Sequence, residues 1–153
     1  MENQTKTNFQ LNNLSLGDKI ILGSGIVALI SLFLPWQELG MLGTLIGISD
    51  YAWLPFILGW GLPVFTIFKP LKIKIVFSLC GNLAAFLWSI IYILFSGVEN
   101  PFTDEVIKTS TWGVYIFCLA TLALGGGIVL KNKVKNVAGL VDIIKADIQS
   151  FKK

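Results

Sequence analysis

The sequence contains no histidine and no arginine. Histidine is the commonest general base and metal ligand, and arginine is the usual bidentate partner of phosphate, so the most frequent catalytic and phosphate-clamping arrangements are excluded. The two cysteines, Cys80 and Cys118, have no Cys-x-x-Cys spacing and supply neither a zinc site nor a disulfide framework. Motifs of nucleotide-binding loops, zinc proteases and serine hydrolases are also missing. We therefore expect no enzymatic activity, no catalytic residue, no metal and no cofactor.

Charge is scarce as well. Charged residues make up 14% of the 153 residues, whereas a soluble domain has roughly 25%. Hydrophobic residues make up 54%, and the mean hydropathy is +0.74. Because the chain lacks the polar side chains that would cover a soluble globule, we expect an integral membrane protein with lipid as its solvent.

Four stretches of the chain carry no charged residue: residues 20–37, 51–68, 75–98 and 109–130, each 18 residues or longer. A helix of about 18 to 20 residues crosses the hydrocarbon core of a bilayer, and the stretches lack the polar–apolar alternation of membrane strands. The sequence therefore predicts an all-α, polytopic bundle of four transmembrane helices in residues 20–130. An N-terminal tail, residues 1–19, precedes it, and an amphipathic tail, residues 131–153, follows it.

The lysines are segregated along the chain. Eleven of the twelve lie in the two tails and between the second and third spans, and only Lys108 lies in the other loops. Short lysine-rich loops stay in the cytoplasm, so we expect a multi-pass protein of the plasma (inner) membrane with the N-terminus and the C-terminus cytoplasmic. The lysines can pair with anionic lipid of the inner leaflet, and no nucleic-acid partner is needed to explain the net charge of +3.

The first outer loop is unusually apolar for a loop. Its residues 39–48 are almost wholly apolar or glycine, and so short a segment cannot cross a bilayer. It could lie in the headgroup layer, dip back as a re-entrant turn or pack against a partner; alternatively, it extends the first span and covers the outer mouth of the bundle. The candidate partner contacts in this loop are Leu39, Leu42, Leu45 and Ile46.

Aromatic residues gather at the predicted outer ends of the spans. Tryptophan and tyrosine prefer the interface between lipid and water. The sequence therefore predicts an outer aromatic belt that consists of Trp36, Tyr51, Trp53, Trp112 and Tyr115.

The second span contains four helix-weakening residues, Pro55, Gly59, Gly61 and Pro63. Proline removes one helical hydrogen bond and leaves a carbonyl group free. These residues are hinge candidates, and a broken helix could line the substrate site of a carrier. Alternatively, they form a bend whose free backbone groups bond to neighbouring helices.

The third and fourth spans carry small and polar residues at helical spacing. Ser78, Asn82, Ala85 and Ser89 share one helical face, and Thr121 and Gly125 form a small-xxx-small pair. We expect the Asn82 face to point toward protein, because an amide in lipid needs a hydrogen-bonding partner and small residues let helices approach closely. These six residues are candidates for helix packing or for lining a pore.

The C-terminal tail shows a second helical pattern. Its apolar residues recur at spacings of four and three, opposite a face of charged and polar residues, which predicts an amphipathic helix that lies on the inner leaflet or pairs with a like helix. The apolar stripe is Val137, Val141, Ile144, Ile148 and Phe151.

The first predicted span ends in Ser31-Leu32-Phe33-Leu34-Pro35-Trp36, and a glycine-rich apolar loop and three more spans follow. This arrangement resembles small uncharacterised four-span bacterial membrane proteins with a Leu-Pro-Trp exit from the first span. The resemblance implies a four-helix bundle and no catalytic residues.

Three functional hypotheses follow from these patterns. The first is a non-enzymatic membrane protein that forms a homo-oligomer, or that serves as an accessory or immunity-type subunit of another membrane component. The second is an oligomeric pore or channel-like effector with a lumen lined by Ser78, Asn82, Ser89 or Thr121. The third is a small facilitative carrier that uses the second span.

Overall fold

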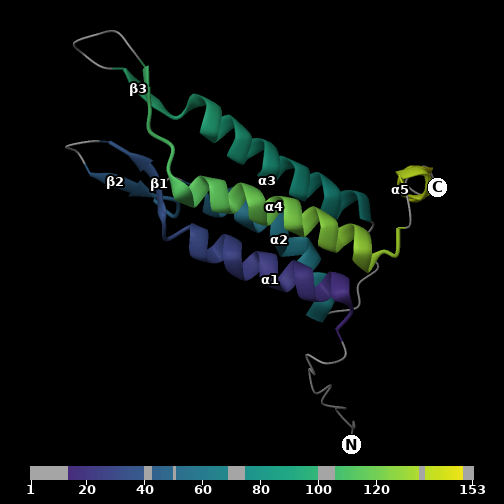
Figure 1. Ribbon diagram of the computed structural model, residues 1–153. Coiled ribbons are helices and arrows are strands. Elements are labelled where there is room, and N and C mark those ends of the chain that lie inside the picture. The colour runs from purple at the N-terminus through teal and green to yellow at the C-terminus, as the bar shows by residue number, and fades with distance from the viewer. Residues whose placement is uncertain are drawn as a thin grey trace, which may run out of the picture.

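A computed structural model shows how the predicted segments are arranged (Figure 1). The structure describes residues 14–39, 43–49, 51–68, 75–99, 106–134 and 137–149. This part of the chain is mostly helical, which confirms the all-α prediction. Its helices are α1 (Leu16–Ser31), α2 (Trp53–Phe68), α3 (Ile75–Phe95), α4 (Trp112–Lys131) and α5 (Val137–Gln149). Its strands are β1 (Pro35–Glu38), β2 (Thr44–Ile46), β3 (Gly97–Glu99) and β4 (Val106–Lys108).

The helices α1 to α4 run side by side, as Figure 1 shows, with the strands at one end of the bundle. The start of α1 and the helix α5 both lie at the opposite end, and α5 runs across the bundle direction. We refer to the end with the strands as the hairpin end and to the other as the α5 end. The chain therefore runs along the bundle an even number of times between the start of α1 and α5, which lie at the same end.

The helices are shorter than the charge-free stretches from which they were predicted. Helix α1 ends at Ser31, and the chain turns into β1 at Pro35. Helix α3 ends at Phe95, before β3, and α4 begins at Trp112. Apolar runs do not distinguish helix from buried strand, so the helix ends could not be predicted from hydrophobicity.

Two antiparallel hairpins close the hairpin end, and the sequence patterns did not predict them. Strand β1 pairs with β2, and β3 pairs with β4. A bridge between Gln37 and Ser110 joins the first hairpin to the segment that leads into α4. In the same place the backbone N–H of Glu38 donates to the carbonyl of Thr109 at 2.9 Å. The first hairpin thus lies over the end of the bundle rather than extending α1.

Aromatic rings pack in the interior of the bundle toward its hairpin end. The indole of Trp36 contacts the rings of Tyr92 and Phe117 edge to face, with centroids 5.3 and 5.2 Å apart. Phe117 in turn contacts Trp60 at 5.5 Å, and Trp60 stacks on Phe56 at 5.4 Å. We call these five residues the aromatic core. It joins β1 and the helices α2, α3 and α4.

The prediction that Trp36 belongs to an outer aromatic belt was wrong. Its side chain is fully buried, and its Nε1 donates to the Ser31 carbonyl at 2.8 Å. Gly47 lies against the indole so closely that a Cβ there would stand 2.5 Å from Nε1. The hairpin therefore folds Trp36 inward, which a composition argument could not anticipate. The other four predicted belt residues are exposed: Tyr51, Trp53, Trp112 and Tyr115.

Helices α1 and α4 come into backbone contact at the α5 end. A Cβ on Gly17 would overlap the backbone nitrogen of Lys131. A Cβ on Gly127 would stand 2.9 Å from Cγ1 of Ile21 and 3.2 Å from the Gly17 carbonyl oxygen. Only glycine permits this approach. The crossing brings the first turn of α1 beside the last turn of α4.

The outward faces of α1 to α4 are apolar. Two helices, α3 and α4, are long and apolar enough to cross a membrane, and α2 is a shorter apolar helix. Large exposed apolar side chains occur on each of the four helices, for example Ile30 on α1, Ile57 on α2, Ile91 on α3 and Leu119 on α4. A soluble protein rarely exposes so much contiguous apolar surface.

Candidate functional site

A groove of about 350 Å³ lies between α3 and α4. Asn82 projects from α3 toward Gly125 of α4, where a Cβ would stand 2.8 Å from the Asn82 amide nitrogen. The Oδ1 atom of Asn82 is buried and has no hydrogen-bond partner among the described residues. The groove is lined by Leu79, Asn82, Leu83, Phe86, Thr121, Leu122, Gly125 and Gly126.

The rest of the predicted Asn82 face lies inside the bundle. Ala85 and Ser89 are fully buried, and Ser78 is 8% exposed. The Ser89 hydroxyl donates to the carbonyl of Phe86 at 2.7 Å, within its own helix. Thr121, which is also fully buried, donates to the carbonyl of Cys118 in the same way at 2.6 Å. The hydroxyls of Ser89 and Thr121 therefore have their hydrogen-bond acceptors within one copy of the chain.

The hinge candidates lie in a helix without a break, since α2 runs from Trp53 to Phe68 through Pro63. Pro55 lies in the first turn, where a missing N–H costs nothing. Gly59 is a packing residue, because a Cβ there would stand 3.1 Å from Cβ of Ala85. Gly61 is exposed, and only a carbon of Ile57 lies near its Cβ position.

The predicted contact residues of the loop and tail are only partly described. Leu39, Leu45 and Ile46 are half-buried in the first hairpin, and Leu42 lies outside the described residues. In α5, Val141 and Ile148 are 40% and 48% exposed, Ile144 is half-buried, and Phe151 lies outside the described residues. The predicted apolar stripe did not include Leu140 and Ile143, which pack against the hydrophobic core of the bundle.

An ion pair connects the helix ends at the α5 end. The ammonium of Lys131, the last residue of α4, lies 2.9 Å from Oδ1 of Asp18. It also donates to the hydroxyl of Thr66 in α2 at 3.0 Å. Ser15 caps α1 by accepting from the backbone N–H of Asp18 at 3.1 Å, and its hydroxyl donates to Oδ2 of Asp18 at 2.6 Å. Four side chains from three helices therefore form one polar cluster.

The charge on Asp18 is stabilised by this cluster. Burial raises the pKa of the Asp18 carboxyl, but the hydrogen bond with Ser15 and the ammonium of Lys131 outweigh burial and hold the pKa below its ordinary value. Asp18 precedes the charge-free part of α1, which begins at Ile20. The side chains of Lys131 and Asp18 are 25% and 16% exposed, so water screens their attraction only in part.

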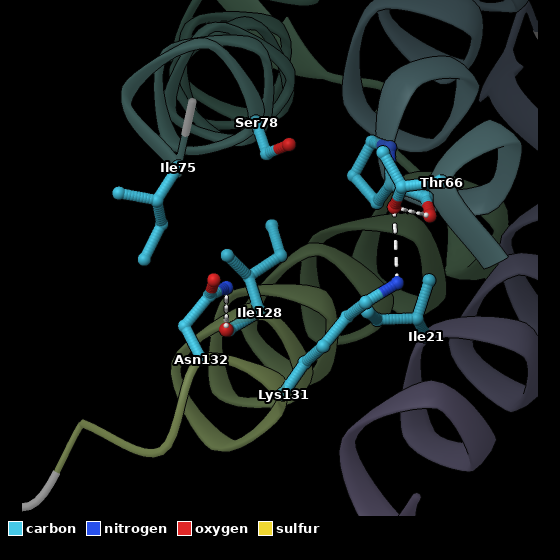
Figure 2. Close-up of a pocket in the computed structure, with 8 residues that line it drawn as sticks. Ile21, Thr66, Ile75, Ser78, Ile128, Lys131 and Asn132 are labelled. Carbon is cyan, nitrogen blue, oxygen red and sulfur yellow. Dashed lines mark hydrogen bonds between the residues drawn. The ribbon is translucent and has the colours of Figure 1, made fainter. Parts of the chain in front are cut away.

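A cavity of about 150 Å³ opens beside this ion pair (Figure 2). Figure 2 shows Lys131 reaching Thr66 on one side of the cavity, with Ser78 and Asn132 on other sides. The Asn132 amide nitrogen donates to the Ile128 carbonyl at 2.8 Å. The lining residues are Ile21, Pro63, Thr66, Ile75, Ser78, Ile128, Lys131 and Asn132. They come from all four helices of the bundle and from the residue that follows α4.

The sequence patterns did not predict this cavity or its ion pair. The predicted spans end at the first charged residue on each side, which leaves Asp18 and Lys131 in the tails. One local signal was available: Ser15 followed three residues later by Asp18 is the pattern of a helix N-cap. It indicates that the helix begins before Ile20 and includes the carboxylate.

Among the described residues, no group of three or more histidine, cysteine, aspartate or glutamate side chains could hold a metal ion. Comparisons of the chain with protein-family models, with curated proteins and with solved structures find no match. The geometry of the groove and of the cavity therefore carries the functional argument.

Proposed function

We propose that the protein is a non-enzymatic integral membrane protein of four spans that acts by association. Its partner is a helix of another membrane component, either a second copy of the chain or a different protein that it serves as an accessory or immunity-type subunit. The observation that carries this proposal is the α3–α4 groove, in which Oδ1 of Asn82 is buried without a hydrogen-bond partner from the described residues.

The apolar outward faces support insertion of all four helices. Helices α1 and α2 have 16 residues each, which corresponds to about 24 Å at 1.5 Å per residue. These helices are a few ångströms shorter than the hydrocarbon core of about 30 Å. Local thinning of the bilayer accommodates such a difference. Both helices lie beside α3 and α4 in Figure 1 and expose large apolar side chains as those helices do.

The α5 end supports an orientation with this end in the cytoplasm. Lysines are concentrated in the chain up to the first turns of α1, between α2 and α3, and from the last residue of α4 onward, and such segments remain on the cytoplasmic side. Helix α5 runs across the bundle direction and exposes Val141 and Ile148. An amphipathic helix in this position can lie in the inner leaflet with these side chains in the acyl region.

The groove suits a helix as its occupant. Gly126 has no atom within 4 Å of its Cβ position, and Leu122 is 56% exposed. A small residue beside a polar amide lets a partner backbone approach, and one interhelical hydrogen bond contributes about 0.6 to 2 kcal/mol in a membrane. A small rotation of Asn82 would turn its amide toward such a partner.

Two alternatives fit the geometry less well. A pore lumen between copies would be lined by Ser78, Asn82, Ser89 or Thr121, but Ser89 and Thr121 are fully buried in one bundle and Ser78 is 8% exposed. A carrier of this kind would use a broken α2, but α2 continues through Pro63 and the residue is buried. The aromatic core also fills the interior of the bundle toward its hairpin end.

The test is the mass of the assembly in lipid nanodiscs, measured by native mass spectrometry. We expect the wild-type chain to carry a second copy or a co-purifying protein subunit, and Asn82→Leu to lose it with little change in thermal stability. Cys80→Leu is the matched control, because Cys80 is an exposed residue of α3 outside the groove lining. An assembly that is the same for wild type and Asn82→Leu contradicts the proposal.

A further inference from the structure

The cavity at the α5 end has a lining that is both polar and apolar. Lys131, Thr66, Ser78 and Asn132 contribute polar groups, and isoleucines contribute much of the remainder (Figure 2). Its volume of about 150 Å³ is on the order of ten times what one water molecule needs. A cavity of this size and polarity holds either a cluster of waters or a polar ligand.

Ser78 is the exception among the buried helical hydroxyls. The others donate to the carbonyl three residues earlier in their own helix: Ser24, Ser31, Thr66, Ser89 and Thr121. Ser78 is 8% exposed, lines the cavity, and has no hydrogen bond to a described residue. The Ser78 Oγ is not among the buried polar atoms that lack a partner, so it is accessible from the cavity and can bond to a molecule that fills it. Its orientation in Figure 2, toward the interior of the cavity, points to a ligand there.

Lys131 supplies the charge of the cavity. An ammonium has three N–H donors, and Asp18 and Thr66 account for two of them. Asp18 is not among the lining residues, and no lining residue is acidic. The amide of Asn132 uses one N–H on the Ile128 carbonyl and keeps a second. The cavity therefore presents a cationic donor and neutral donors, without a carboxylate on its wall.

We propose that this cavity binds one phosphate group, held by the ammonium of Lys131, the hydroxyl of Ser78 and the amide of Asn132. Phosphate oxygens accept several hydrogen bonds at once and favour charged donors. The proposal rests on the membrane insertion proposed above, because the α5 end then lies at the inner headgroup layer. The phosphate comes from an anionic lipid headgroup or from free phosphate, and the two sources share the same chemistry.

Delipidated protein in mild detergent, titrated with short-chain phosphatidylglycerol and separately with inorganic phosphate under native mass spectrometry, tests the site. We expect one molecule bound per chain, with about tenfold weaker affinity for Ser78→Ala, the effect of losing one hydrogen bond to a charged group. Ser89→Ala is the matched control, because its hydroxyl is bonded within α3 and lies outside the cavity. The control should bind as the wild type does.

Binding of phosphatidylglycerol but not of inorganic phosphate identifies a lipid site, and binding of both with equal dependence on Ser78 identifies a phosphate site open to either. Binding of neither ligand, or binding that Ser78→Ala leaves unchanged, overturns the proposal. A zwitterionic arm with short-chain phosphatidylcholine checks that net charge matters, and equal affinity for it contradicts the role of Lys131. The assembly mass of the same samples reports separately on association, so failure of this site leaves the groove proposal standing.

Discussion

The ammonium of Lys131 lies 2.9 Å from Oδ1 of Asp18, so the last residue of α4 is joined to the first turn of α1. Both charges occupy favourable helix ends, because a carboxylate stabilises an N-terminus and an ammonium stabilises a C-terminus. The pair sits directly over the glycine crossing of the same two helices. The glycine crossing and the ion pair thus both hold α1 against α4 at the α5 end.

Asp18→Asn should lower the free energy of unfolding by about 1 kcal/mol at neutral pH, since it removes a partly buried ion pair. The pKa of Asp18 is lowered in the folded protein, so its stabilisation is complete above its unfolded pKa of about 3.9 and is lost as pH falls through the folded pKa. Thermal melts in detergent at pH 7 and at successively lower pH measure this. Asp142→Asn, at an exposed position of α5, is the charge-matched control. Equal melting temperatures for wild type and Asp18→Asn at pH 7 contradict the role of the pair.

The glycine crossing makes a paired prediction on α1. Gly17→Ala should destabilise the bundle by about 1 to 3 kcal/mol, because its Cβ would overlap the backbone of Lys131 and force the helices apart. Gly23→Ala should be neutral or stabilising by up to about 1 kcal/mol, because nothing lies within 4 Å of its Cβ position and alanine favours helix. Unfolding in a denaturing detergent titration compares the two. If they behave alike, backbone contact does not fasten α1 to α4.

The buried indole of Trp36 makes a second paired prediction. Trp36→Ala should cost about 3 to 5 kcal/mol, since it empties a site enclosed by Tyr92, Phe117 and Gly47. Trp112→Ala should change stability by less than about 0.5 kcal/mol in detergent, because its side chain is 78% exposed. The same detergent titration measures both variants. If Trp36→Ala changes the stability only slightly, the result contradicts a buried Trp36 and favours the predicted position in the interfacial belt.

Sequence patterns predicted the helical class because charge-free length is a strong signal for helices in lipid. Helices α2 and α3 fall within the predicted stretches, whereas α1 begins at Leu16 and α4 ends at Lys131, outside them. The hairpins were not predicted, because apolar runs do not distinguish helix from strand. The bridge between Gln37 and Ser110 was not predicted either, because it joins segments that are far apart in the sequence. Period-3.6 spacing placed Ser78, Asn82, Ala85 and Ser89 on one face. It could not show that the Ser78 hydroxyl alone lacks a bond within its helix, because that depends on rotamers and on the neighbouring helices.

The orientation of the bundle can be tested by cysteine labelling in a background without Cys80 and Cys118. Thr44→Cys lies in the first hairpin and Gln149→Cys lies near the end of α5, and both positions are exposed. In intact cells, a membrane-impermeant maleimide should label the hairpin position only, and permeabilisation should be needed to label the α5 position. Labelling of both positions before permeabilisation contradicts a cytoplasmic α5 end.

The most direct test of the central claim is photo-crosslinking in native membranes from a benzophenone amino acid at Leu122, which is 56% exposed and lines the α3–α4 groove. The same probe at Leu29 of α1, which is 46% exposed and lies outside the groove, is the control. We expect a discrete protein adduct from Leu122 only, at twice the mass of the chain for self-association or at another fixed mass for a partner protein. Adducts of equal yield from both positions, or none from Leu122, would contradict association through the groove.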